Sequence, residues 1–82
     1  MKKSVFSVVD VAAQCYGNPF FMVNKAVAIR DFHHACRDNT TTIGRNPEDF
    51  HLVYLGEYDD VLCSFELLPQ PERIASGFPD KE

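Results

Sequence analysis

The sequence predicts an α+β fold, in which a small antiparallel sheet in the order β-β-α-β-β carries one main helix packed on it. Two stretches before residue 24 and two after residue 49 are rich in β-branched and aromatic residues, a composition typical of strands. Between them, residues 25–38 repeat apolar side chains at the spacing of an amphipathic helix. With 82 residues, 45% of them hydrophobic and 24% charged, the chain has the composition of a single globular domain covering residues 1–82.

The first predicted strand covers residues 4–12 and carries apolar side chains on both faces. Such two-sided apolarity is typical of an inner strand or of an edge that a dimer covers. Gly17 and Pro19 then indicate a turn, because Gly allows positive φ and Pro fixes φ at about −65°. The short apolar run at residues 20–23 is the second predicted strand, paired with the first.

The main predicted helix runs from Lys25 to about Asp38. Asn24 is a suitable N-cap, because its side-chain oxygen can accept a hydrogen bond from the free N–H groups of the first turn. One stripe of this helix is apolar and is predicted to pack in the core; it consists of Ala28, Ile29, Phe32, Ala35 and Cys36. The other predicted core residues are Phe20, Phe21 and Leu52.

The carboxyl half is predicted to form a polar loop followed by a β-hairpin. Turn-forming residues dominate positions 38–49. Residues 50–60 alternate between two faces in the manner of a strand, and residues 61–68 form its return partner.

Pro69 and Pro71 are predicted to end this second hairpin strand, because proline lacks the N–H group that a sheet ladder needs. A short helical turn within residues 71–78 is an additional candidate element. We expect the charged tail to be frayed from about residue 79.

Charge is distributed unevenly along the chain, although the net charge is only −4. Residues 1–46 hold six Lys or Arg and three acidic residues, whereas residues 47–82 hold two and nine. An acidic chain is in general a poor DNA binder, because phosphate affinity comes from clustered Lys and Arg. The basic amino half could still bind DNA through one face, and the acidic carboxyl half could meet a basic partner.

The three cysteines are an odd number without CxxC spacing, which argues against a disulfide framework and a zinc ribbon and fits a reducing cytoplasm. The apolar run at the amino end is interrupted by Ser7 and Asp10 and lacks a convincing cleavage site, so we expect no secretion signal. No apolar run approaches the roughly 20 residues of a spanning helix, so we expect no membrane partner.

Basic side chains on the predicted helix form a second stripe, in which Arg30, His33 and Arg37 are spaced three and four residues apart. With other cations of the amino half and one turn tyrosine, the candidate nucleic-acid-binding residues are Lys2, Lys3, Tyr16, Lys25, Arg30, His33, Arg37 and Arg45. A solvated helix face is the alternative, and Arg30 could instead pair with Glu48 or Asp49. The candidate partner-binding residues are the acidic Glu57, Asp59 and Asp60.

The motifs predict neither a catalytic nor a metal site. His33 with Cys36, or with Cys63 and His51, offers zinc-binding residue types, but Cys36 already lies in the apolar stripe and the spacing is not that of a zinc site. The cysteines lack a motif that supplies a base and an oxyanion donor, and the chain has no Gly-rich phosphate loop or GxSxG motif. We therefore expect a non-enzymatic protein without a metal or cofactor.

Three blocks of sequence occur in order between residues 16 and 77: "YGNPFFMVNKAVAIRDF", "RNPEDFHLVYLGEYDD" and "LLPQPERIASG". Together they resemble the small nonstructural protein of gokushovirus-type microviruses, phages with circular single-stranded DNA genomes. In the first block the matching positions are Gly17, Pro19, Phe20, Phe21, Asn24, Ala28, Arg30 and Phe32. In the other two they are Asn46, Pro47, Glu48, Asp49, Phe50, Leu52, Leu55, Gly56, Tyr58 and Asp59, then Pro71, Ile74 and Ala75.

The resemblance implies a viral nonstructural protein, made in the host bacterial cytoplasm, that serves genome replication or the switch to single-strand synthesis and packaging. It also implies a DNA-binding role, with single-stranded DNA as the expected partner, and no catalytic residues. The alternative is a dimeric interaction module that acts on a phage replication or capsid protein, or on a host factor, without binding DNA. In both cases we expect a homodimer, because so short a chain buries a small share of its surface.

Overall fold

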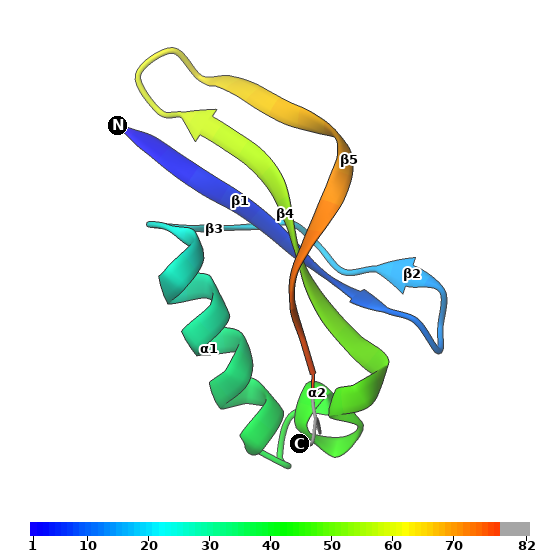
Figure 1. Cartoon of the computed structure of the whole chain (residues 1–82). Coiled ribbons are helices and arrows are strands. Elements are labelled where there is room, and N and C mark those ends of the chain that lie inside the picture. Colours follow the sequence, from blue (N-terminus) through cyan, green and yellow to red (C-terminus); the bar gives the residue numbers. More distant parts are fainter. Residues whose placement is uncertain (78–82) are drawn as a thin grey trace.

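A computed structural model describes residues 1–77 and shows a strand-rich sheet, curled into a half-barrel, with one main helix (Figure 1). Of the described residues, 48% lie in strands and 26% in helices. The predicted fold class, α+β in the order β-β-α-β-β with a short C-terminal helical turn, is therefore wrong. The predicted frayed tail lies outside the described residues.

The centre of the sheet is strand β1 (Lys2–Asp10). Two short strands, β2 (Cys15–Tyr16) and β3 (Phe20–Met22), pair with it in an antiparallel direction along the same edge. The predicted second strand at residues 20–23 corresponds to β3, and β2 is an additional short strand. The predicted turn at Gly17 and Pro19 is wrong, because the chain turns earlier, at residues 11–14, where Gln14 takes a positive φ. On its other side β1 pairs with β4 (Phe50–Asp59) over nearly its whole length.

The last strand, β5 (Ser64–Ser76), pairs with β4 and forms an edge of the sheet. It runs through Pro69 and Pro71 instead of ending there, and it also occupies the segment where a helical turn was predicted. Proline is tolerated in an edge strand because its missing N–H can face away from the ladder. Register shifts interrupt the β1–β4 and β4–β5 ladders. Such bulges bend strands, which accounts for the curl.

The main helix, α1 (Lys25–Arg37), confirms the predicted start and end within one residue. The backbone N–H of Val27 donates to Asn24 Oδ1 at 2.9 Å, so Asn24 is the N-cap. The predicted polar loop contains a short helix, α2 (Thr42–Arg45), and a 3-10 turn, η1 (Pro47–Asp49).

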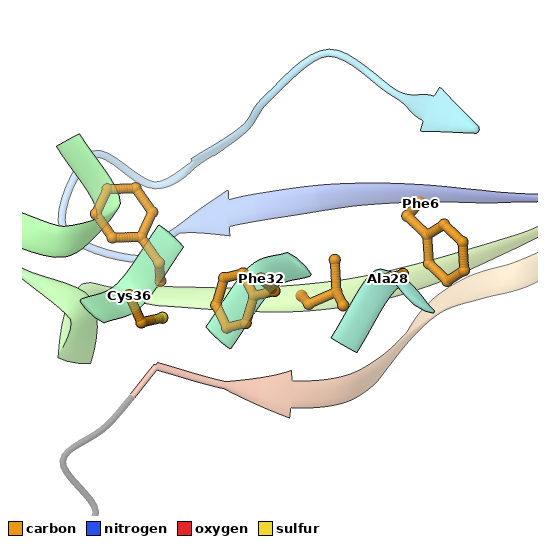
Figure 2. Packing of buried hydrophobic residues seen from close by; sticks show 6 residues of the cluster. Phe6, Ala28, Phe32 and Cys36 are labelled. Carbon is orange, nitrogen blue, oxygen red and sulfur yellow. The ribbon is translucent and has the colours of Figure 1, made fainter. Parts of the chain in front are cut away.

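The core lies between α1 and one face of the sheet. Figure 2 shows Ala28, Phe32 and Cys36 in a row along α1, with Phe6 of β1 beyond Ala28. The buried cluster consists of Phe6, Ala28, Phe32, Cys36, Phe50 and Leu52. Phe20 is partly buried against this cluster, so the predicted core positions of Phe20, Phe32 and Leu52 are confirmed.

The predicted core position of Phe21 is wrong, because its side chain is 44% exposed. Successive residues of a strand point to opposite faces. Phe20 pairs with the buried Phe6, whereas Phe21 pairs with Val5 on the other side of the sheet. Neighbouring aromatic residues of β3 therefore have different environments.

Candidate functional site

The sheet has two faces of different character. We call the face that carries Phe6, Leu52 and α1 the helix face, and the opposite face the open face. The middle of the open face is buried at Val5, Ser7 and Val53, and its ends are exposed. Cross-strand partners in an antiparallel ladder project to the same side of the sheet. The register therefore assigns most strand residues to one face or the other.

The open face carries a row of aromatic side chains from three strands. Lys3 pairs with Tyr58, and Tyr58 pairs with Phe65. The ring centroids are 4.8 Å apart for Tyr58 and Phe65, 5.4 Å for Phe21 and Tyr58, and 6.3 Å for Phe21 and Phe65. We call Phe21, Tyr58 and Phe65 the aromatic row. At these separations each ring contacts the other two, so the three rings form a triangle.

The acidic residues of the strands lie on the helix face. Their partners in the ladders place them there, and they are Asp10, Glu57, Asp59, Glu66 and Glu72. Glu72, for example, pairs with Tyr54, whose ring lies 5.6 Å from that of Phe6. Among the paired strand residues that the structure describes, the open face instead holds the cations Lys3 and Arg73.

One acidic side chain reaches the open face from outside the ladders. Asp60, in the turn after β4, has its Oδ2 3.7 Å from Lys3 Nζ and its Oδ1 2.7 Å from the amino terminus. The hydrogen bond from the amino terminus, with a smaller contribution from Lys3, lowers the pKa of Asp60. Lys3 is thus partly neutralised, but through a solvent-exposed contact that is weak.

The predicted nucleic-acid-binding residues do not form a single patch. Lys2 and Lys3 begin β1 near one end of the molecule, whereas Arg45 ends α2 at the other end (Figure 1). Tyr16 lies on the open face, because it pairs with Val9, and its side chain is 56% exposed.

Two of the predicted lysines are engaged with acidic residues on the helix face. Lys2 Nζ lies 3.4 Å from Glu66 Oε1 and 3.8 Å from Glu57 Oε1, and the hydrogen bond to Glu66 raises the pKa of Lys2. Lys25 Nζ lies 3.7 Å from Glu72 Oε1 and 4.3 Å from the centre of the Tyr54 ring. These contacts are solvent-exposed and weak, like that of Lys3 with Asp60. What distinguishes Lys2 and Lys25 is that they lie beside acidic residues of the helix face, which repel a phosphate.

The remaining candidates lie on the helices. Arg30 is exposed, and its Nε lies 3.5 Å from the Oδ1 atom of the neighbouring Asp31, which is the ion pair that the structure shows for it. His33 is half-buried, with its ring centroid 5.9 Å from that of Phe32. Arg37 is exposed at the last position of α1. All three are therefore separated from the open face by the sheet.

The predicted partner-binding acids have structural contacts. Asp59 Oδ1 accepts hydrogen bonds from the backbone N–H groups of Val61 and Leu62, at 2.9 and 3.3 Å, and so stabilises the β4–β5 turn. Asp60 anchors the start of β1, and Glu57 lies beside Lys2. Of these residues, Glu57 is the one that is not tied to the turn or the amino terminus.

Sequence reasoning missed Tyr58, Phe65 and Arg73. Tyr58 and Phe65 lie in segments correctly predicted as strands, but their proximity depends on the register of the β4–β5 hairpin. The position of Arg73 on the sheet was not predicted, because its segment was expected to be helical instead of part of β5. The sequence did contain one indication, because Tyr58 lies between Glu57 and Asp59, and alternation in a strand places it on the opposite face from these acids.

Residues 1–77 contain neither a metal-binding cluster nor a helix that could span a membrane. In this part of the chain no three His, Cys, Asp or Glu side chains lie close enough together to hold a metal ion. Cys36 is buried in the core, while Cys15 and Cys63 are exposed. None of the described helices has the length and apolarity to cross a membrane.

Comparison with known proteins relates nearly the whole chain to a phage family. The family model described as "Phage ORF5 protein" matches residues 3–78, which include the core cluster, the aromatic row and all the described strand residues except Lys2. No curated protein and no solved structure gives a match. On the extent of the family match, this chain is a phage protein and belongs to the phage ORF5 protein family.

Proposed function

We propose that this protein is a non-enzymatic DNA-binding protein of a gokushovirus-type, single-stranded DNA phage. It acts in the host bacterial cytoplasm, in genome replication or in the switch to single-strand synthesis and packaging. Membership of the phage ORF5 family supports the phage origin. The resemblance of the three sequence blocks supports the rest.

The observation that carries the DNA-binding proposal is the sorting of side chains between the two faces of the sheet. The acids of the strands lie on the helix face, where Glu57 and Glu66 pair with Lys2, and Glu72 pairs with Lys25. The open face holds Lys3, Arg73 and exposed aromatic side chains. A cationic, aromatic surface is the type that binds single-stranded nucleic acid.

The placement of charge changes the expected mode of binding. The basic stripe of α1 was the first candidate, but Arg30 pairs with Asp31. With two cations on the open face and a net charge of −4, phosphate contacts are few. We therefore expect modest affinity that falls with salt, since each phosphate contact on a single strand changes the slope of log affinity against log salt by about 0.7.

A titration of the full chain with fluorescently labelled oligothymidine, at low and at physiological salt, tests the proposal. We expect binding that weakens with salt, and a smaller salt slope for the Lys3→Gln, Arg73→Gln double variant. The matched control is the Arg30→Gln, Arg45→Gln double variant, which removes the same charge elsewhere and should keep the slope. Absence of binding, or binding indifferent to salt, would contradict the proposal.

A second candidate is an interaction module that works as a homodimer, or on a phage or host protein, without DNA. The observation in its favour is the turn between β4 and β5, where Val61 and Leu62 are 77% and 71% exposed beside Asp59 and Asp60. Adjacent exposed apolar residues favour a protein contact. Here the wild-type chain should bind no oligothymidine, and Leu62→Ser should lower its sedimentation coefficient or the phage yield. The opposite pattern would exclude this candidate.

A further inference from the structure

We propose that the aromatic row binds unpaired nucleobases by stacking, and that it makes the protein prefer single-stranded over duplex DNA. This inference rests on the proposed DNA-binding function and names the part of the DNA that the open face contacts. The occupant is one segment of single strand, with its bases against the rings and its phosphates toward Lys3.

The geometry of the row suits stacking. Phe21 of β3, Tyr58 of β4 and Phe65 of β5 form a triangle of rings tilted by 44° to 67° to one another, and Phe21 and Phe65 are 44% and 52% exposed. An open cavity of about 510 Å³ lies at this site, lined by the three rings, Lys3 and Cys63. The cavity therefore presents aromatic surface together with one cation. Every base has a π face, so such a surface accepts bases of any sequence.

The hydroxyl group of Tyr58 holds this side chain in place and leaves the face of its ring free of hydrogen bonding. It donates a hydrogen bond to Cys63 Sγ at 3.5 Å, at the turn that joins β4 to β5. This contact links the Tyr58 side chain to the hairpin turn. The ring face is not used by that hydrogen bond.

Charge favours a nucleic acid over a second copy of the chain as the occupant. Lys3 lines the cavity, and Arg73 lies further along the same face. The strand acids that would repel phosphate are on the helix face, and Asp60 contacts Lys3 only at the solvent-exposed rim. A phosphate near Lys3 would compete with Asp60 for the ammonium group. A second copy, with the same cations on its own open face, would bring like charges together.

Stacking on the row requires bases whose faces are accessible. In duplex DNA these faces are already covered by neighbouring base pairs, so a protein that stacks must pay an unstacking cost there. A single strand can turn its bases toward the rings. This difference predicts a preference for single strands that phosphate contacts alone would not produce.

The first test uses the wild-type chain and three probes with equal numbers of phosphates: oligothymidine, an abasic oligomer and a duplex. Anisotropy of a labelled probe reports affinity, and quenching of tyrosine fluorescence reports base contact. We expect binding to the abasic and duplex probes to be at least about 10-fold weaker. Equal affinity for oligothymidine and the abasic oligomer would overturn the stacking proposal.

The second test removes single rings and then restores them. Phe21→Leu and Phe65→Leu should each weaken oligothymidine binding by about 5- to 100-fold, while Phe65→Tyr should keep nearly wild-type affinity. Leu62→Ala is the matched control for loss of exposed apolar surface at the same end. Thermal unfolding of each variant shows whether the fold is kept.

The outcomes separate the inference from the proposed function. If the wild-type chain binds none of the DNA probes, both fail. If it binds oligothymidine, but the Leu variants and the abasic probe bind equally well, only stacking fails. If the Leu variants change the sedimentation coefficient and not the DNA affinity, the row is a contact between copies of the chain and stacking is overturned.

Discussion

Gly56 has a φ of +144°, a backbone conformation that residues with side chains rarely adopt. It lies in β4 at the irregularity where the register with both β1 and β5 shifts. A Cβ atom added there would collide with the backbone carbonyl oxygen of Glu66. Glycine at this position therefore permits the bulge that bends the sheet.

We expect Gly56→Ala to lower the free energy of unfolding by about 2 kcal/mol or more, through backbone strain and the collision with β5. Gly17→Ala is the matched control, because a Cβ at Gly17 would meet Val8 O at an ordinary 3.5 Å, and its loss should stay below about 1 kcal/mol. Urea unfolding measures both. Equal losses would show that Gly56 has no special conformational role.

His51 of β4 is half-buried, and within residues 1–77 its buried Nδ1 atom has no hydrogen-bond partner. Burial lowers the pKa of His51, and the nearby charge of Arg73 lowers it further. The unfolded chain, where the pKa of histidine is about 6.5, therefore takes up a proton more readily than the folded protein. Stability from this residue is complete above that value and is lost as the pH falls below it.

Urea unfolding between pH 7.5 and 5 should therefore show stability decreasing toward the acidic end, with a flatter profile for His51→Gln. The pKa values of Asp38 and Asp60 are also lowered. Their contribution to the stability of the fold is therefore lost only at more acidic pH than that of His51. His34→Gln, on the exposed side of α1, is the control and should follow the wild-type profile. An unchanged profile for His51→Gln would exclude His51 as the cause.

At the scale of elements, α1 could be predicted and β5 could not. The start of α1 depends on Asn24 and its length on the apolar stripe, both of which are local in the sequence. The course of β5 depends on pairing with β4, a contact across the hairpin, and on its edge position, which tolerates Pro69 and Pro71. Non-local pairing of this kind does not appear in the residues of the segment itself.

Non-local pairing also explains why Phe32 and Phe21 differ in burial, although the sequence analysis predicted both in the core. The pairing of β3 with β1 places Phe21 on the side of the sheet away from α1. We expect Phe32→Ala to lower the free energy of unfolding by about 3–5 kcal/mol, because Phe32 is 5% exposed and fills the space between α1 and the sheet. Phe21→Ala should cost less than about 1.5 kcal/mol, because its ring is already half in solvent. Similar losses in urea unfolding would show that Phe21 belongs to a core after all.

At the scale of the whole molecule, folding brings the basic amino half and the acidic carboxyl half together. Lys2 and Lys25 meet Glu57, Glu66 and Glu72 on the helix face. The sequence shows the difference in charge between the halves, but the basic region it suggests is largely matched by acids in the fold. What remains available is the open face, which could be recognised only when the register of the strands was known.

The most direct test of the open face as the DNA-binding surface is a nuclear magnetic resonance titration of the ¹⁵N-labelled chain with oligothymidine. We expect the largest amide shifts at Lys3, Phe21, Tyr58, Phe65 and Arg73, with the amides of α1 nearly unchanged. Shifts centred on Arg30 and Arg37 of α1, or no shifts at saturating oligothymidine, would contradict this account.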